Sequence, residues 1–244
     1  MRLLHENEGD TVAFTGGIMF VGMWMVKDLL TVGPEEPLGD IACLMARHRI
    51  RRLPVVRQTA DGNKLLGIVS YSDVLHVVPA DLNPFSVAAR DDLFSRPDQL
   101  LNSTAEDIMH ENPLTITPND PIEQAAQLML DKKIGALPVM HQDHLVGMIT
   151  ESDLFRAFVS LFEAKEPGVR VTFDISSGED IFPVVADLVK KHHLRLHTMV
   201  SLPHHTRALC VISVFGQHVE KMVEDLWKSR HAVVNVIPLK PVNG

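Results

Sequence analysis

Residues 37–56 read PLGDIACLMARHRIRRLPVV, and the chain contains this pattern twice. At a shift of 84 positions it aligns with PIEQAAQLMLDKKIGALPVM, residues 121–140, and eight of the twenty pairs are identical. The alignment resumes at a shift of 80, where LLGIVSYSD at 65–73 meets LVGMITESD at 145–153. An internal repeat of this kind predicts two copies of one supersecondary unit.

Each copy has the pattern of a helix, two strands joined by a turn, and a second helix. Apolar residues at i, i+3, i+4 and i+7 predict one buried stripe on the first helix. The stripes are Leu38, Ile41, Ala42 and Met45 in the first copy and Ile122, Ala125, Ala126 and Met129 in the second. The runs LPVV or LPVM and LLGIV or LVGMI predict a hairpin. We expect N-caps at Ser72 and Ser152 for the second helices, and at Asp120 before Pro121.

From residue 168 the pattern changes, after the helix-breaking Glu-Pro-Gly at 166–168. Residues 169–175 alternate as a strand, and apolar spacing predicts helices over about 181–188 and 219–226. Further strands are expected at about 194–202, 207–215 and 232–237. The order β-α-β-β-α-β is that of a ferredoxin-like split βαβ unit, with helices on one face of an antiparallel sheet.

The composition is that of a globular chain, with 45% apolar and 22% charged residues. The net charge of −8 makes the chain a poor partner for nucleic acid. The only two cysteines, Cys43 and Cys210, stand in apolar stretches, which favours a reducing compartment over a disulfide framework. We therefore expect a cytoplasmic protein that binds neither nucleic acid nor membrane.

The segment Thr11–Val26 carries no charge. Its sixteen residues are too few to span a bilayer, and the acids before it do not suit a signal peptide. Two interpretations stay open, since a Gly-Gly pair shortly before Met19 is also typical of a translated ribosome-binding site upstream of a start codon. Under both, we expect residues 1–22 to lie outside the fold.

The repeated pattern of an apolar-Pro-apolar strand, a hairpin and then GIVSYSD or GMITESD resembles the cystathionine β-synthase (CBS) domain. Two such domains form a pseudo-twofold Bateman module. The C-terminal β-α-β-β-α-β order resembles an ACT domain, and the whole arrangement is similar to the CBS-plus-ACT family of acetoin utilization operons. The resemblance implies an α/β (α+β) fold and a non-catalytic regulatory protein that senses an adenine nucleotide.

This resemblance sets the expected domain boundaries. They are an N-terminal extension at 1–22, a first CBS domain at 23–80, a spacer at 81–103, a second CBS domain at 104–163 and an ACT-like domain at 168–240.

The acids Asp73 and Asp153 are the principal candidates for ligand contact. One ionised carboxylate can accept hydrogen bonds from both hydroxyls of a ribose. Ser70 and Thr150, three residues earlier, add a hydroxyl on the same approach, and the amides at a helix start favour phosphate.

The remaining candidates surround these acids. His76 and Arg156 follow the acids by three residues, on the same helical face, where a cation can meet a phosphate. We expect Pro54 and Pro138, with their apolar neighbours, to cover the base. Arg51 and Arg52 add positive charge to the first copy.

Several alternatives stay open. Ser-Asp is also a common helix start, so capping alone could explain both acids. Asp28 to Pro37 spans 9 positions whereas Asp107 to Pro121 spans 14, so the first copy is expected to lack five residues of the loop that, in the family it resembles, helps line the adenine pocket. The ligand could be AMP, ADP, ATP, NADH or S-adenosylmethionine, since all present the same adenosyl diol. The histidines around His192 and His204 are spaced as a helix end and a turn, so no metal site is expected.

Two expectations about function follow. The protein would regulate acetoin utilization or related carbon metabolism through an unidentified target enzyme or protein. It would form a homodimer, because the C-terminal sheet has an exposed edge. The alternatives are a structural dimerisation module with vestigial pockets and a regulatory part related to IMP dehydrogenase.

Overall fold

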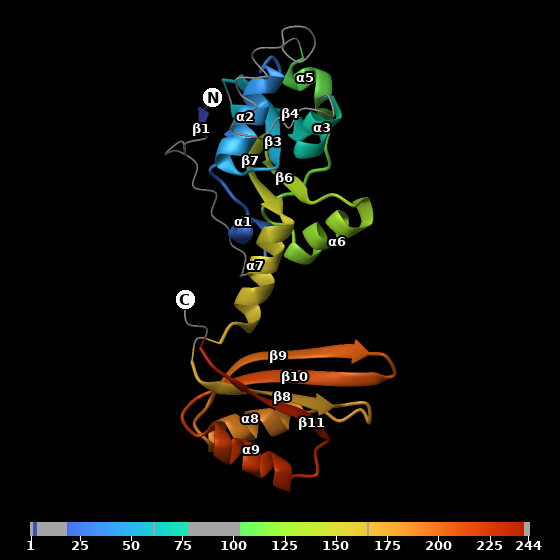
Figure 1. Cartoon of the computed structure of the whole chain (residues 1–244). Coiled ribbons are helices and arrows are strands. Elements are labelled where there is room, and N and C mark those ends of the chain that lie inside the picture. Colours follow the sequence, from blue (N-terminus) through green and yellow to red (C-terminus); the bar gives the residue numbers. More distant parts are fainter. Residues whose placement is uncertain (1, 4–18, 61, 78–102, 165, 242–244) are drawn as a thin grey trace. The chain divides into compact units, whose positions relative to one another are not determined.

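The computed structural model describes residues 2–3, 19–60, 62–77, 103–164 and 166–241. The chain divides into two compact units, residues 1–157 and 158–244, and each is described by itself (Figure 1). Apart from Ser103, the expected spacer at 81–103 lies outside the described residues, as does most of the expected extension at 1–22.

The first unit contains the two predicted copies, except for the end of helix α7 (Glu151–Phe162) from Phe158 onward, which is assigned to the second unit (Figure 1). The first copy consists of α2 (Leu38–His48), β3 (Arg52–Thr59), β4 (Gly62–Ser70) and α3 (Tyr71–Val77). The second consists of α6 (Ile122–Lys132), β6 (Ala136–His141), β7 (His144–Thr150) and α7 (Glu151–Phe162). In both copies the strands pair antiparallel, so the predicted helix-hairpin-helix repeat is confirmed.

Helices α2 and α6 bury the stripes that the apolar spacing predicts. All four stripe residues of α2 are buried, and so are three of the four in α6, where Ala126 is half-buried. Both helices end in a left-handed residue, Arg49 and Lys133, each with φ of 54°. The expected N-cap at Asp120 is wrong: Pro121 is the N-cap, because the Asp120 carboxylate accepts a hydrogen bond of 2.7 Å from the Thr117 amide in the preceding turn.

Short segments are exchanged between the copies. Helix α1 (Val21–Trp24) precedes the first copy, yet Val21 is fully buried in the core of the second, together with Ile122 and Ile149. Helix α5 (Ala105–Ile108) precedes the second copy, yet Ala105 packs in the core of the first. The expectation that residues 1–22 lie outside the fold is therefore wrong for its last residues, because their apolar side chains fill a core on the other copy.

The hydrogen bonds of the exchanged segments show a pseudo-twofold relation. Each of these hydrogen bonds has a counterpart. Adding 84 to the residue number in the N-terminal half and subtracting 84 from the residue number in the C-terminal half gives the equivalent bond, in which donor and acceptor have changed halves. The pairs are Val21 N to Asp120 O (3.0 Å) with Ala105 N to Glu36 O (2.9 Å), and Ile122 N to Met19 O (2.8 Å) with Leu38 N to Ser103 O (2.9 Å). The predicted pseudo-twofold arrangement of the two copies is confirmed.

The loop before the first helix has the same length in both copies. The bridges Val32–Val55 and Ile116–Val139 are also 84 positions apart. The expected five-residue deletion is therefore wrong, because it placed Asp28 opposite Asp107, whereas the fold places Met23 there. Strand β5 (His110–Glu111), which precedes the second copy, pairs with β4 of the first, whereas β1 (Arg2–Leu3) pairs within the N-terminal half, with β2 (Leu30–Thr31).

Side chains of both copies meet in one shared apolar cluster. Its buried members are Leu29, Val56, Ala136, Leu145 and Met148. Strands β4 and β7 also contact each other directly. Because the cluster draws on both hairpins, neither copy buries its full apolar surface without the other.

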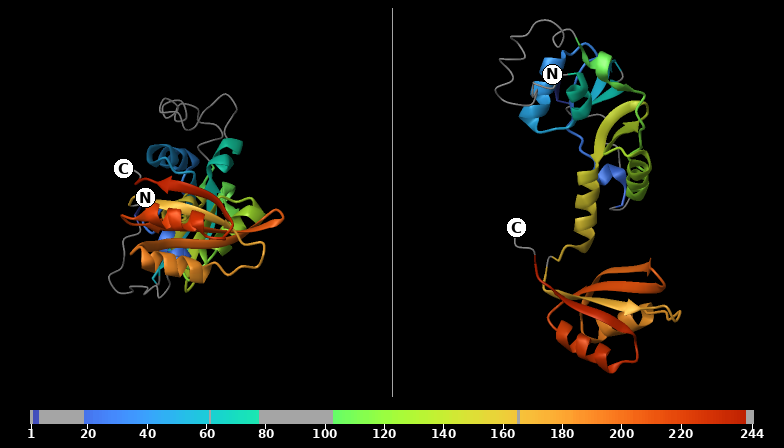
Figure 2. Two further views of the ribbon diagram at one scale, coloured as in Figure 1. Left: turned by 90° about the horizontal axis from the view of Figure 1, so that it is seen from below. Right: turned by 45° about the vertical axis from the view of Figure 1, so that its right-hand side comes forward.

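The second unit has the predicted order β-α-β-β-α-β. Its elements are β8 (Gly168–Asp174), α8 (Phe182–Lys191), β9 (Arg195–His204), β10 (Arg207–Phe215), α9 (Val219–Lys228) and β11 (Val233–Leu239). The antiparallel sheet has the order β11-β8-β10-β9, and both helices cover one of its faces (Figure 2). The core between sheet and helices contains Phe173, Ile212, Met222 and Leu226, so the ferredoxin-like prediction is confirmed.

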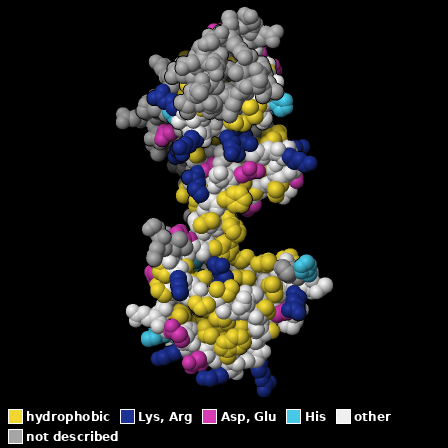
Figure 3. Space-filling model, in the orientation of Figure 1, with side chains coloured by type: hydrophobic (Ala, Val, Ile, Leu, Met, Phe, Trp, Pro, Cys, Tyr) yellow, Lys and Arg dark blue, Asp and Glu magenta, His cyan; other side chains and the backbone are white. Residues whose placement is uncertain are grey.

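Exposed apolar side chains are prominent on α7. The helix exposes Phe155, Phe158 and Val159, and apolar surface is visible along it in Figure 3. Within the part of the chain that the structure describes, no helix has both the length and the apolar character needed to cross a membrane.

Candidate functional site

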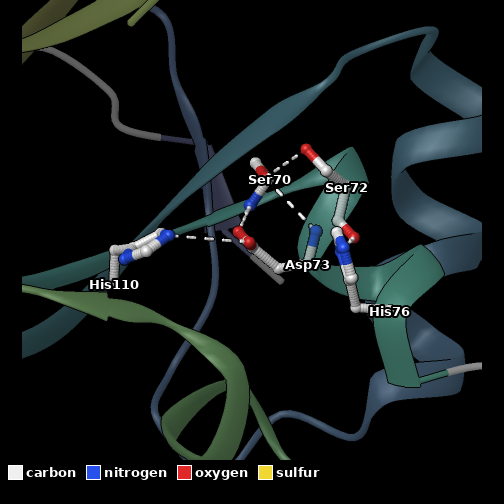
Figure 4. A network of polar contacts seen from close by, with 5 residues as sticks. All are labelled: Ser70, Ser72, Asp73, His76 and His110. Carbon is white, nitrogen blue, oxygen red and sulfur yellow. Dashed lines mark hydrogen bonds and ion pairs between the residues drawn. The ribbon is translucent and has the colours of Figure 1, made fainter. Parts of the chain in front are cut away.

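The start of α3, here called the first site, is organised by a reciprocal capping pair. The Ser70 amide donates to Oδ2 of Asp73 at 2.7 Å, and the Asp73 amide donates to Oγ of Ser70 at 3.3 Å (Figure 4). This is a capping box with Ser70 as the N-cap and Asp73 three residues later. The expected N-cap at Ser72 is wrong, because its hydroxyl faces that of Ser70 at 3.1 Å and α3 already begins at Tyr71.

The second carboxylate oxygen of Asp73 faces a histidine from an exchanged segment. Nε2 of His110 lies 3.7 Å from Oδ1 of Asp73, beyond hydrogen-bond distance, and the two side chains are 82% and 17% exposed. His76 turns back onto α3, where Nδ1 lies 2.7 Å from the Ser72 carbonyl oxygen. His110 was not among the expected site residues, because its position beside β4 depends on the exchange of β5 and not on spacing along the chain.

The start of α7, here called the second site, is capped in the same way, but both carboxylate oxygens of Asp153 are engaged by other groups of the protein, so we call this carboxylate closed. Oδ2 of Asp153 accepts hydrogen bonds from the amide and the hydroxyl of Thr150, at 2.7 and 2.6 Å. Oδ1 pairs with Arg156, three residues later on the same helix. Asp153 is 1% exposed, whereas the Arg156 side chain is 65% exposed. Thr150, not Ser152, precedes the first residue of α7, so the expected N-cap is wrong here too.

The placement of Arg156 differs from the expectation that it faces a phosphate. Its guanidinium binds the acid that was expected to receive the ribose. The spacing of three residues on one helical face explains this, since it brings the two side chains together.

The two prolines lie inside the hairpins. Pro54 and Pro138 are buried, opposite Ile68 and Met148 on the partner strands. Their carbonyl oxygens accept hydrogen bonds from the amides of Val32 and Ile116, at 3.1 and 3.0 Å. The prolines thus fix the loop that precedes each first helix.

The side chains of Arg51 and Arg52 lie at different sites. Arg51 is exposed, and its carbonyl oxygen accepts a hydrogen bond from the Tyr71 amide at 2.8 Å, at the start of α3. Arg52 is half-buried, and its side chain reaches Gly135 of the second copy. The structure therefore places Arg51 at the first site and the guanidinium of Arg52 beside the second.

Charged groups also meet in the second unit. Asp225 of α9 accepts hydrogen bonds from Lys191 at 2.7 Å, and His192 lies 2.8 Å away. The hydrogen bond from Lys191, followed by that from His192, lowers the pKa of the Asp225 carboxyl. Among the residues that the structure describes, no group of three or more His, Cys, Asp or Glu side chains is placed to hold a metal ion.

Comparison with known proteins assigns the first unit. The CBS domain family matches residues 21–80 and 105–160. A CBS domain-containing protein of Dictyostelium discoideum is 32% identical over 150 residues, which are 61% of this chain and 97% of that protein. The chain belongs to the CBS domain proteins. The match begins at residue 21, in agreement with the burial of Val21 in a CBS core.

Other CBS relatives are longer than the matched region. An uncharacterized protein of Methanocaldococcus jannaschii is 29% identical over 136 residues, which are 55% of this chain and 45% of that protein. The inosine-5'-monophosphate dehydrogenase of Korarchaeum cryptofilum is 29% identical over 199 residues, or 78% of this chain and 37% of the enzyme. The chain thus spans less than half the length of either relative.

Two solved CBS structures are also similar. One is assigned as the acetoin utilization protein AcuB of Vibrio cholerae, with 30% identity, a TM-score of 0.45, and coverage of 59% of this chain and 93% of that one. The other is CBSX2 in complex with AMP, with 26% identity, a TM-score of 0.47, and coverage of 59% and 99%.

Proposed function

We propose that the protein is a non-catalytic regulatory protein that senses an adenine nucleotide of the AMP, ADP or ATP class through its CBS pair. The observation that carries the proposal is the open carboxylate of the first site. Oδ2 of Asp73 is engaged by the Ser70 amide, while the His110 ring, 3.7 Å away, is the one charged partner that Oδ1 has among the residues the structure describes. A carboxylate oxygen accepts two hydrogen bonds, so Oδ1 is suited to the two hydroxyls of a ribose.

The surroundings of the first site fit the rest of a nucleotide. Arg51 and His76 are exposed at the start of α3 and along it. His110 adds a third basic side chain from the exchanged segment. These groups suit a phosphate, while Pro54 and its apolar neighbours in the hairpin would cover the adenine.

The second site requires a rearrangement. Oδ1 of Asp153 is held by Arg156, so ribose hydroxyls would have to replace that guanidinium. The exposed Arg156 side chain is free to swing outward, where it would meet the phosphate of the same ligand. S-adenosylmethionine, which presents the same diol, is an alternative ligand at both sites.

The closed carboxylate of Asp153 also favours a second candidate function. Its three hydrogen bonds are accounted for by helix capping and by Arg156. A structural dimerisation module with vestigial pockets would have the same geometry. The similarity to IMP dehydrogenase, which covers 37% of that enzyme, carries no catalytic function to this chain.

The second unit is proposed to be an ACT-like dimerisation and signalling domain. Its β-α-β-β-α-β order and its sheet with edge strands β9 and β11 support this assignment. Pairing of an edge strand with a second subunit would cover unpaired backbone groups, as expected for a homodimer. The family resemblance suggests a cytoplasmic target in acetoin utilization or related carbon metabolism.

A thermal-shift panel of AMP, ADP, ATP, NADH and S-adenosylmethionine tests the proposal. A ligand at 100 times its Kd stabilises the folded state by about 2.7 kcal/mol, a rise in Tm of about 5 to 10 °C at this chain length. Asp73→Asn should reduce the shift. The control is Asp107→Asn, which removes the acid of a similar capping box at Thr104 and should retain the shift. A flat panel would favour the structural dimerisation module.

A further inference from the structure

His110 brings a titratable ring to the first site from the segment that precedes the second copy. Its backbone is fixed by the pairing of β5 with β4, where His110 lies opposite Ile68. Nε2 of the ring lies 3.7 Å from Oδ1 of Asp73, the carboxylate oxygen that the Ser70 amide does not bind (Figure 4). This distance is within the range of an ion pair but too long for a hydrogen bond.

The two partners differ in their freedom to move. The side chain of Asp73 is 17% exposed and is held through Oδ2, whereas that of His110 is 82% exposed. A small rotation of the exposed ring would bring Nε2 to Oδ1 without any change in the backbone. A protonated ring gains a charge-assisted hydrogen bond from this rotation, and a neutral ring has no such charge to add.

Asp73 is the acid that faces the ring. The other titratable or charged groups on the elements around it are Glu106 and Asp107 of α5, Glu111 of β5, Tyr71 and His76 of α3, and Arg51 just before β3. Asp107 is bound by Thr104 in the capping box of α5, and His76 turns back to the Ser72 carbonyl oxygen. Among the residues that the structure describes, no acid other than Asp73 lies within 4.0 Å of a ring nitrogen of His110.

The second site has a different residue at the equivalent position. The shifts of 84 and 80 place Val26 opposite His110, and Val26 bridges to Met148 as His110 pairs with Ile68. Valine does not titrate. The cation that holds the acid of the second site is Arg156, and a guanidinium keeps its proton throughout the pH range in which proteins fold. A response to protons at this position is therefore confined to the first site.

We infer that protonation of His110 closes the first site to the ribose of an adenosine ligand and that deprotonation opens it. The inference rests on the proposed function and adds a regulation to it. The imidazolium and the ribose hydroxyls compete for the same acceptor, Oδ1 of Asp73. The charge of a histidine side chain changes between about pH 5 and 8, so the first site binds its ligand more tightly towards the alkaline end of that range.

Calorimetric titration of the full chain with adenosine at about pH 5.5 and about pH 8 tests this regulation. Adenosine is the probe because the phosphate of AMP itself titrates near about pH 6 and can meet the displaced imidazolium. The natural chain should bind adenosine at its first site roughly 2- to 5-fold more weakly at the lower pH, the range expected of a partly exposed ion pair. His110→Gln should bind equally at both. The matched control is His48→Gln, which removes an exposed histidine at the end of α2 and should retain the pH dependence.

Asp73→Asn assigns the effect to the first site, since the adenosine binding that remains at the second site should not depend on pH. A chain that binds neither AMP nor adenosine at about pH 8 contradicts the proposed function itself. The inference alone fails if AMP binds and the affinity for adenosine is the same at both pH values, or if the pH dependence survives in His110→Gln or in Asp73→Asn. It also fails if AMP binds and adenosine does not, because the ribose contact is then too weak for an imidazolium to compete with.

Discussion

The carboxylate of Asp153 is a buried charge held by three donors, two from Thr150 and one from Arg156. Asp153→Asn would replace an acceptor oxygen by an amide that cannot accept from them. We expect the free energy of unfolding to fall by about 1 to 3 kcal/mol. Urea denaturation measures the loss. The exposed acid Asp107 caps α5 in the same way, so Asp107→Asn should cost less. Equal losses would show that burial adds nothing at Asp153.

The sequence pairs each acid with the hydroxyl three residues before it, but the N-caps were expected at Ser72 and Ser152 and lie at Ser70 and Thr150. Ser70 with Asp73, and Thr150 with Asp153, are three residues apart, and a spacing this local fixes which side chains meet. His110 and Arg52 reach their sites through tertiary structure. Their positions depend on the exchange of β5 and on the space at Gly135, and neither follows from spacing along the chain.

At the scale of single elements, helix α1 is short but anchored by one side chain. Val21 is fully buried in the core of the second copy, whereas Met23 on the same helix is 51% exposed. Val21→Ala should lower the free energy of unfolding by about 1 to 3 kcal/mol through the cavity it leaves. Chemical denaturation of both variants provides the measurement. Met23→Ala is the matched control and should change stability little; a loss as large as that of Val21→Ala would place the anchor elsewhere.

Helices α8 and α9 are joined by Asp225, which Lys191 and His192 approach from α8. Because these hydrogen bonds lower the pKa of Asp225 in the folded state, the link stabilises the unit above the unfolded pKa of about 4. The stabilisation is lost as the pH falls through the lower, folded pKa. Asp225→Asn should therefore lower Tm modestly at neutral pH, and the two Tm curves should converge below about pH 4. Curves that stay parallel into acid would exclude an ionised Asp225 as the cause.

Periodicity predicted most elements but could not assign segments to cores. The strand expected at 207–215 coincides with β10, and α2 buries the expected stripe. An apolar stripe shows which face of a helix is buried, yet not against which partner. For that reason, spacing along the chain does not reveal that Val21 joins the second core or Ala105 the first.

For the whole molecule, the question of association can be divided between the two units. The second unit has its own core and two open sheet edges, so residues 158–244 expressed alone should fold and dimerise without affinity for adenine nucleotides. Sedimentation velocity of this fragment and of the full chain provides the measurement. A monomeric fragment beside a dimeric full chain would contradict edge pairing. The exposed apolar residues of α7 would then be the next candidate, tested by Phe155→Asp in the full chain.

The exchange of α1 also governs the order in which the chain can mature on the ribosome. Val21 is translated about 130 residues before Ile149, one of its neighbours in the second core. At ~5 to 20 residues per second, the nascent chain carries this apolar segment without its native neighbours for roughly 6 to 25 s. The core of the first copy is completed after a shorter delay, because Ala105 is translated about 30 residues after Val74 of the same core. During translation, chaperones can therefore bind the N-terminal segment until β7 has left the exit tunnel.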